Sequence, residues 1–393
     1  MIGAPSPRLP FGEPEHPETG SLDADAIAAA TLASLRGASP HRLHKLFHCF
    51  GDPVRALEAV LAGHAAAALP DDRHRDAIAR RWAAAADPHG VEAMLRNRGT
   101  RVFTTGRPDF PIDPGLDDAP AVLFAEGDRP DVLDRPRVAI VGTRAATPQG
   151  IADAGAIGRY LAEQGVTVVS GLAIGIDGAA HEGALEVGGG AIGVVATGLD
   201  IVYPRRHARL FDRVRRHGLV LGEHGVGVPP TRLRFPIRNR IIAALCDATV
   251  VVEATATGGS RITANLALAY NREVLAMPGS RRNPAAAGCN ALIADGAHPL
   301  LDPSDVIAVL ARSSPASAYS ALAAASSGAG WGGAPTRVGR AARQLHSAMS
   351  GEPATLDELV GRSGSTVGEI AGLVRELERA GRIERARGML WPL

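Results

Sequence analysis

The sequence has few cysteines and no long apolar run. Its three cysteines, Cys49, Cys246 and Cys289, lie far apart without a C-x-x-C pair. This excludes a disulfide framework and a zinc knuckle, and predicts buried free thiols and no metal site. No stretch reaches the ~18 consecutive apolar residues that cross a bilayer, and the N-terminal residues show no basic region followed by an apolar one. We therefore expect a cytoplasmic protein without a membrane segment.

Aromatic residues are also scarce, at 4%, although 46% of the 393 residues are hydrophobic. With 46 glycines and 28 prolines, this composition is typical of a globular chain rich in turns, whose cores are built from Ala, Val, Ile and Leu. It excludes collagen, a coiled coil and a disordered charged tail as the main structure. The length predicts two to four domains.

Positive charge comes almost entirely from arginine, because Lys45 is the one lysine of the chain, and it is unevenly distributed. The net charge is +1, yet residues 200–240 hold ten arginines against three acids, a local net of +7. A cationic segment on a nearly neutral chain indicates a localised anion site. For residues 209–216 we favour the alternative, a solvated arginine-rich helix face.

Five successive segments differ in composition. Residues 1–20 hold five prolines and predict a flexible tail, and residues 21–105 show helical periodicity in a small all-α domain. Residues 106–311 form the next segment. Residues 312–337 have the Ala/Ser/Gly composition of a linker, and residues 338–393 give three helical segments and a hairpin, the outline of a winged helix.

The third segment alternates short apolar runs with helical stretches. The expected strands cover 138–141, 166–170, 191–196, 219–222, 248–254 and 273–278, and the expected helices 150–164, 176–187, 206–217, 238–246 and 260–271. Strands this apolar are buried on both faces, so the fold class is α/β with a doubly wound parallel sheet.

Glycine follows every one of these strands. Ligands of such sheets bind beyond the carboxyl ends of the strands, where glycine permits close backbone approach and helix N-termini favour anions. The loops read Gly142-Thr143-Arg144, Ser170-Gly171, Thr197-Gly198, His224-Gly225, Gly258-Gly259-Ser260 and Pro278-Gly279-Ser280. The sequence therefore predicts an anion cradle at this edge of the sheet.

The common catalytic and nucleotide motifs are absent from these loops. There is no G-x-G-x-x-G, no G-x-x-x-x-G-K-[ST], no G-x-S-x-G and no H-E-x-x-H. Asp177 and His181, four residues apart at a helix start, could form an acid/base or metal pair, but we favour a role in capping the helix and fixing a loop.

A second dense motif is Phe235-Pro236-Ile237-Arg238-Asn239-Arg240. Two arginines in the first turn of a helix place guanidinium groups beside its positive end, which suits an anion. The alternative is that they pair with Glu223 and Glu253. We hold these alternatives nearly even for Arg240 and favour the anion role for Arg238.

Taken in order, these motifs resemble the DNA-processing protein A family (DprA, also called Smf). The matching stretches are VAIVGTR (138–144), SGLAIGIDGAAHEGAL (170–185), GLDIVYP (198–204), GEHGVGVPPTRLRFPIRNRII (222–242), VVVEATATGGSRITANLA (250–267), AMPGS (276–280) and GCNALIADGA (288–297). The resemblance implies an extended Rossmann-like domain between a SAM-like helical domain and a winged helix. It also implies a homodimer that binds and protects single-stranded DNA and helps load the RecA recombinase in natural transformation, with no catalysis and no cofactor.

Carried over by motif, the resemblance assigns a DNA groove to Arg144, to Arg205 or Arg206, and to Arg238. Phe235 either offers a stacking surface or belongs to the core. Of these two interpretations we favour the core. The other residues assigned to the groove are Gly142, Thr143, Ser170, Gly171, Asn239, Arg240, Gly258, Gly259 and Ser260.

Two segments depart from DNA-binding patterns. Pro40 stands where a helix-hairpin-helix has its second glycine, so we do not expect residues 21–100 to bind DNA. Residues 338–393 hold eight arginines against seven acids, which makes partner binding or packing as good an interpretation as duplex binding.

Two other classes of function fit the sequence less well. A nucleotide phosphoribohydrolase of the LOG type would need P-G-G-x-G-T-x-x-E, but Pro278-Gly279 is followed by Ser280, and Gly258-Gly259 lacks both the proline and the later acid. A protein scaffold would leave the glycine-rich edge unexplained.

Overall fold

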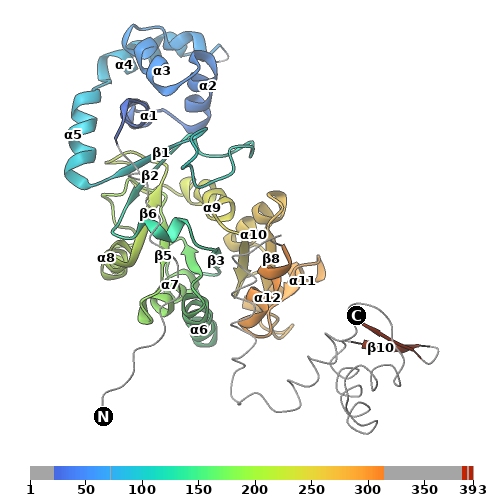
Figure 1. The fold of residues 1–393 in the computed structure, drawn as a ribbon. Helices are drawn as coiled ribbons and strands as arrows, with labels where there is room; N and C mark the ends of the chain where they lie inside the picture. Colours follow the sequence, from blue (N-terminus) through green and yellow to red (C-terminus); the bar gives the residue numbers. More distant parts are fainter. Residues whose placement is uncertain (1–21, 71, 314–382, 387–388, 393) are drawn as a thin grey trace, which may run out of the picture. The chain divides into compact units, whose positions relative to one another are not determined.

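The computed structural model describes residues 22–70, 72–313, 383–386 and 389–392 (Figure 1). The chain divides into two compact units, residues 1–322 and 323–393. The expected tail, nearly all of the expected linker and the three helical segments expected after residue 338 lie outside the described residues. In the second unit, β10 (Ile383–Ala386) and β11 (Met389–Pro392) pair antiparallel, which confirms the expected hairpin.

The first unit begins with helices that pack around small and aliphatic side chains. Several of them start at a capping side chain followed by proline: Ser39 accepts from the Arg42 N–H before Pro40, and Asp52 accepts from the Arg55 N–H before Pro53. Such residues satisfy N–H groups that the helix leaves open. The helices are α1 (Ala24–Ser34), α2 (Pro40–Phe50), α3 (Pro53–Leu61), the 3₁₀ turn η1 (Ala65–Ala68), α4 (Arg75–Ala85) and α5 (Pro88–Arg98).

A nine-stranded sheet follows, with the order β1-β2-β6-β5-β4-β3-β7-β8-β9 among the described residues. Pairing is parallel from β6 to β9, and antiparallel between β1 and β2 and between β2 and β6. The strands are β1 (Arg101–Thr104), β2 (Val122–Glu126), β3 (Arg137–Val141), β4 (Thr167–Ser170), β5 (Ala191–Val194), β6 (Gly218–Gly222), β7 (Ala248–Val251), β8 (Glu273–Ala276) and β9 (His298–Pro299).

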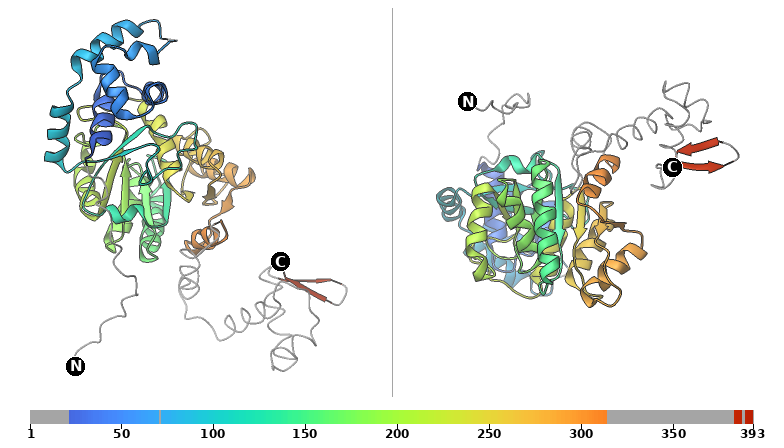
Figure 2. Two further views of the ribbon diagram at one scale, coloured as in Figure 1. Left: turned by 45° about the horizontal axis from the view of Figure 1, so that its top comes forward. Right: turned by 90° about the horizontal axis from the view of Figure 1, so that it is seen from below.

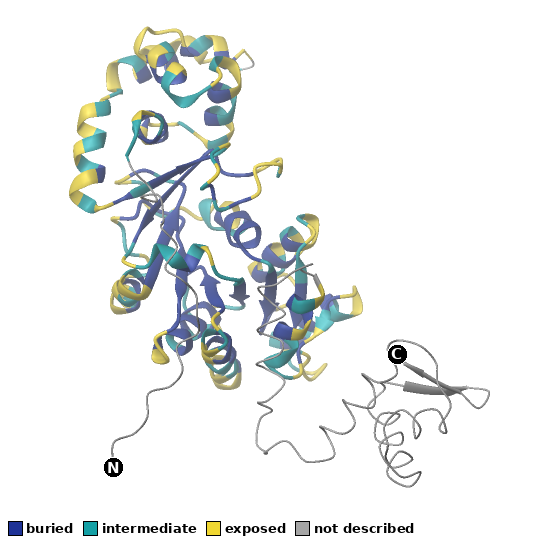
Figure 3. Ribbon diagram, viewed as in Figure 1, coloured by how far each residue is buried: buried dark blue, intermediate teal, exposed yellow. Residues whose placement is uncertain are grey.

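Helices cover both faces of this sheet, and the strands between them are buried (Figures 2 and 3). Val138 and Ile140 of β3 pack in the same cluster as α6, α7 and α12, whereas Ala139 and Val141 pack with α9, α10 and α11. The helices are α6 (Pro148–Glu163), α7 (Ile176–Glu186), α8 (Ala208–His217), α9 (Arg234–Leu245), α10 (Gly259–Ala269), α11 (Ala287–Ala294) and α12 (Ser304–Ser313). Short 3₁₀ turns are η2 (Pro130–Leu133), η3 (Arg205–His207) and η4 (Pro284–Ala286).

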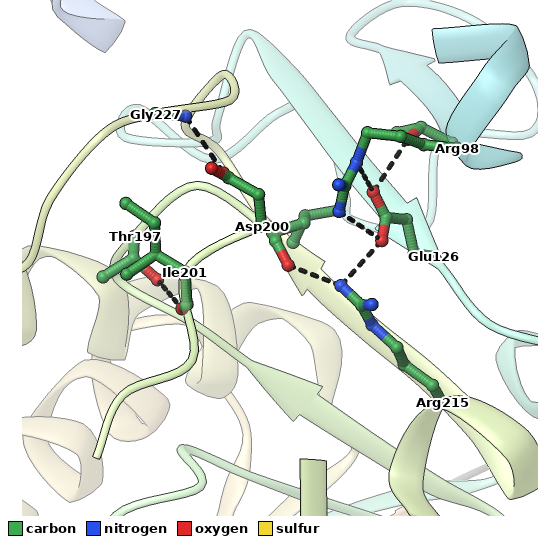
Figure 4. A network of polar contacts seen from close by, with 9 residues as sticks. Arg98, Glu126, Thr197, Asp200, Ile201, Arg215 and Gly227 are labelled. Carbon is green, nitrogen blue, oxygen red and sulfur yellow. Dashed lines mark hydrogen bonds and ion pairs between the residues drawn. The ribbon is translucent and has the colours of Figure 1, made fainter. Parts of the chain in front are cut away.

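A buried carboxylate links the helical segment to the sheet (Figure 4). Glu126, at the end of β2, accepts from Arg98 Nε at 2.8 Å and from Thr100 Oγ1 at 2.9 Å, and pairs with Arg215 of α8, Nη2 to Oε2, at 2.7 Å. Its side chain is only 6% exposed. The carboxylate therefore holds the end of α5 and the end of α8 together.

The six strands expected from the sequence are all confirmed, and the α/β class with them. The sequence did not predict β1, β2 and β9 as separate strands. Residues 101–128, which contain β1 and β2, have a strand-like composition. The expectation of buried thiols holds for Cys246 and Cys289 and is wrong for Cys49, which is exposed near the end of α2. In the described part of the chain, no helix is both long and apolar enough to span a bilayer.

Candidate functional site

A cavity of about 560 Å³ opens at the carboxyl edge of the parallel strands. Its walls come from loops far apart in sequence: 141–144 after β3, Ala173 and Asp177 after β4, and Tyr203 after β5. The starts of α9 and α10 close it. Strand β3 lies between β4 and β7, so the strand order continues from β3 toward one side through β4 and toward the other side through β7. Ligands of α/β sheets bind at such a switch point.

Three helices that start around the cavity lack a side-chain cap. The residues before α7, α9 and α10 are Gly175, Leu233 and Gly258, and none of them supplies a side chain that accepts from the first turn. In α7 the N–H groups of Ile176 and Gly178 donate instead to the backbone carbonyls of Thr143 and Ala173, so this helix leaves fewer N–H groups open. Uncapped N–H groups and the positive end of the helix dipole favour an anion. In contrast, α6 is capped by Thr147, whose own N–H and hydroxyl donate to Glu253 at 2.9 and 2.6 Å.

The glycines of the edge differ in what surrounds them. A Cβ at Gly142 would lie 2.4 Å from the Ile176 side chain, and one at Gly171 would lie 2.4 Å from the Arg238 guanidinium, so both are required by packing within the protein. A Cβ at Gly259 would meet nothing within 4 Å, and no left-handed backbone demands glycine there. Gly259 lines the cavity, so its missing side chain leaves space for a ligand.

Arg238 lines the cavity but is held by the protein. Its exposed fraction is 5%, and Nη1 donates to the carbonyl oxygens of Gly171 at 2.9 Å and of Val194. Burial lowers the pKa of Arg238 to about 10, against the opposing charge of Asp177. Arg238 therefore stays charged at neutral pH and joins the carboxyl ends of β4 and β5.

Asp177 and His181 are buried beside this arginine. Asp177 Oδ2 accepts from the Gly171 N–H at 3.0 Å, and burial raises the pKa of the Asp177 carboxyl. Burial lowers the pKa of His181 to about 4, which keeps the ring neutral. No group of three or more His, Cys, Asp or Glu side chains among the described residues could hold a metal ion. The contacts of Asp177 agree with its expected role in fixing a loop, but the expected capping of the helix is wrong, because α7 has no side-chain cap.

Arg144 and Phe235 face each other in the cavity. The guanidinium carbon of Arg144 lies 5.0 Å from the centroid of the Phe235 ring, within the range of a cation–π contact. Phe235 is half-buried, so it is neither a core residue nor fully open. Arg144 is exposed, and this ring is its one side-chain contact partner among the described residues that forms a hydrogen bond, ion pair or cation–π contact.

The cavity unites nine of the fourteen residues predicted for the site and leaves five outside. Ser170 Oγ donates to the Ile140 carbonyl at 2.6 Å, and Arg240 pairs with buried Glu223. Gly171 contacts Arg238 behind the cavity wall, and Arg205 and Arg206 are exposed on η3. The nine that line it are Gly142, Thr143, Arg144, Phe235, Arg238, Asn239, Gly258, Gly259 and Ser260.

Nine other lining residues were not in the predicted set, and Arg232, Tyr203 and Ile262 are among them. Arg232 belongs to the cationic segment but was not assigned to the site, and Tyr203 entered only as part of the family motif at 198–204. Ile262, in the first turn of α10, carried no signal. Tyr203 could have been found from the sequence, because it is an aromatic residue in a loop that follows a strand, and aromatic residues make up only 4% of the chain.

Comparisons with known proteins agree with this architecture. Residues 101–311 match the family model of DNA recombination-mediator protein A, and residues 333–389 match that of the DprA winged helix domain. The chain belongs to the DprA/Smf family. The predicted fold class, a Rossmann-like α/β sheet with a C-terminal winged helix, is thereby confirmed.

Individual relatives span much of the chain. A putative DNA processing protein DprA of Mycobacterium tuberculosis is 35% identical over 379 residues, covering 92% of this chain and 93% of the relative. DNA processing protein DprA of Streptococcus pneumoniae is 44% identical over 191 residues, or 49% of this chain and 67% of the relative. Its X-ray structure has a TM-score of 0.63 at 33% identity, covering 73% of this chain and 97% of that one.

Proposed function

We propose that the cavity binds the phosphate backbone of single-stranded DNA. The observation that carries this is a cavity with glycine-lined loops and uncapped helix starts, where Arg144 and Arg232 form no ion pair with a carboxylate of the described residues. Guanidinium groups bind phosphate oxygens in a forked geometry, and backbone N–H groups complete such sites.

The charges of the lining favour an anion. Three arginines and one aspartate line the cavity, a formal net of +2. Arg238 and Asp177 are buried together and offset each other. The remaining positive charge lies on Arg144 and Arg232, which are both exposed and so can approach a phosphate.

The family membership supports a wider role. We propose that the protein acts as a homodimer in the cytoplasm, protects incoming single strands, and helps load the RecA recombinase in natural transformation. Support comes from the matched family, a DNA recombination-mediator protein. As part of the same proposal, Arg205 and Arg206 extend the groove from η3, where both are exposed.

The test is fluorescence anisotropy of a labelled single-stranded oligonucleotide across a salt titration. Arg144→Ala and Arg232→Ala should each weaken binding and lower the slope of log affinity against log salt by about 0.7, since each removes about one phosphate contact with a single strand. Arg209→Ala, an exposed arginine of the same cationic segment on α8, is the matched control.

Equal losses in all three variants would mean that binding follows net charge and not this cavity. A wild-type protein that binds duplex as tightly as single strands would contradict the proposed substrate.

A further inference from the structure

Flat side chains form a continuous stack along one wall of the cavity. The stack runs from the Arg144 guanidinium, 5.0 Å from the Phe235 centroid, to Tyr203, whose ring centroid lies 5.4 Å from that of Phe235 at an interplanar angle of 40°. All three residues line the cavity. The stack therefore begins at a cation and ends at an aromatic ring.

Tyr203 is the open end of this stack. Its side chain is 43% exposed, whereas Tyr160 is buried and the Tyr270 hydroxyl is bound by Asp118. A large aromatic side chain left open beside a cationic cavity is in tilted contact with Phe235 and has surface available for another flat group. Tyr203 lies in the loop between β5 and η3, and its ring is held in contact with Phe235 of α9.

We propose that Tyr203 stacks on an unpaired base of the bound strand, and so makes the site select single strands over duplex. This rests on the proposed function, because a phosphate held at Arg144 places its base one sugar away, beside the stack. In a duplex both faces of a base are covered by its neighbours, so no base could add to the stack without leaving the helix.

The experiment compares two labelled single strands of equal length, one of thymidines and one in which the central nucleotides are abasic. Stacking on an aromatic side chain is worth at least about fivefold in affinity per base. Wild type should therefore bind the thymidine strand at least about fivefold more tightly. Tyr203→Ser should remove this difference by weakening only thymidine binding, and Tyr203→Phe should keep it.

Ile237→Ser provides the matched control, because Ile237 is 47% exposed near the start of α9 but does not line the cavity. It should behave as wild type. As a second readout, the fluorescence of 2-aminopurine in the strand should be quenched by wild type and by Tyr203→Phe, and not by Tyr203→Ser.

The outcomes separate the two proposals. Equal wild-type affinity for both strands, or a Tyr203→Ser loss shared equally by both strands, would overturn the stacking role and leave phosphate binding intact. Wild type that binds neither strand would overturn the proposed function and the stacking role with it.

Discussion

The arginines between residues 200 and 240 differ in what each one contacts. Arg238 is buried on backbone carbonyls, Arg240 pairs with Glu223, and Arg213 pairs with Glu182. A count of charges along the sequence indicated a cationic site, and the cavity lies there. The count could not tell which arginines are used inside the fold, because their carbonyl and carboxylate partners lie 17 to 67 residues away in the chain.

Gly259 gives a test at the same scale. Gly259→Val should weaken single-strand binding at least about tenfold, because the added side chain occupies cavity space that nothing in the protein fills. The melting temperature should change little, because apart from the adjacent backbone nothing lies within 4 Å of the new Cβ. Anisotropy titration and thermal unfolding measure the two effects, and unchanged affinity would show that no ligand approaches this glycine.

At the scale of elements, patterning predicted the central strands because both of their faces are buried, as β3 shows with successive residues in opposite clusters. It failed for β9, because a strand of two residues is too short to show a repeating pattern of apolar side chains. Helix α9 begins at Arg234, four residues earlier than expected. Pro236 was taken to precede the helix, but proline is tolerated in the first turn, where N–H groups have no partner in the helix.

The Glu126 network predicts how the helical segment is attached. Glu126→Gln should lower the free energy of unfolding by about 2–4 kcal/mol, because Arg98 and Arg215 lose their charged partner in a buried setting. Glu92→Gln is the control. Glu92 pairs with Arg96 on the surface of α5, the helix that also carries Arg98, and surface ion pairs contribute under about 1 kcal/mol to the free energy of unfolding. Urea unfolding measures both, and similar losses would mean that burial of Glu126 adds nothing.

For the whole molecule, the edge that bears the site was predictable, because parallel strands bring their carboxyl ends together. The composition of the cavity was not, since it depends on side-chain directions at the starts of α9 and α10. Ser170 illustrates this: it ends β4 at the right edge, yet its hydroxyl turns inward to the carbonyl of Ile140.

The stability of the whole fold should depend on pH through His181. Its pKa in the folded protein is about 4, below the ordinary 6.5, so the unfolded chain takes up the proton first. The free energy of unfolding therefore carries no penalty from His181 above pH 6.5. As the pH drops toward 4, this group lowers it by roughly 3 kcal/mol. His181→Leu should lack this loss.

The measurement is urea unfolding of wild type and His181→Leu at pH 7 and pH 4.5. The difference between the two proteins isolates His181, because His224, whose pKa burial also lowers to about 4, is present in both. The same pH dependence in wild type and variant would contradict the assignment.

The order of strands in the sheet also has a consequence for protein synthesis. One wall of the cavity follows β3, and another, residues 258–263, follows β7, which pairs with β3 although it lies 110 residues further along the chain. A chain emerging from the ribosome therefore carries Arg144 long before it carries the opposite wall. If the cavity binds single-stranded nucleic acid as proposed, the nascent polypeptide has no complete site with which to capture it, including its own messenger, until α10 has been made and β7 has docked.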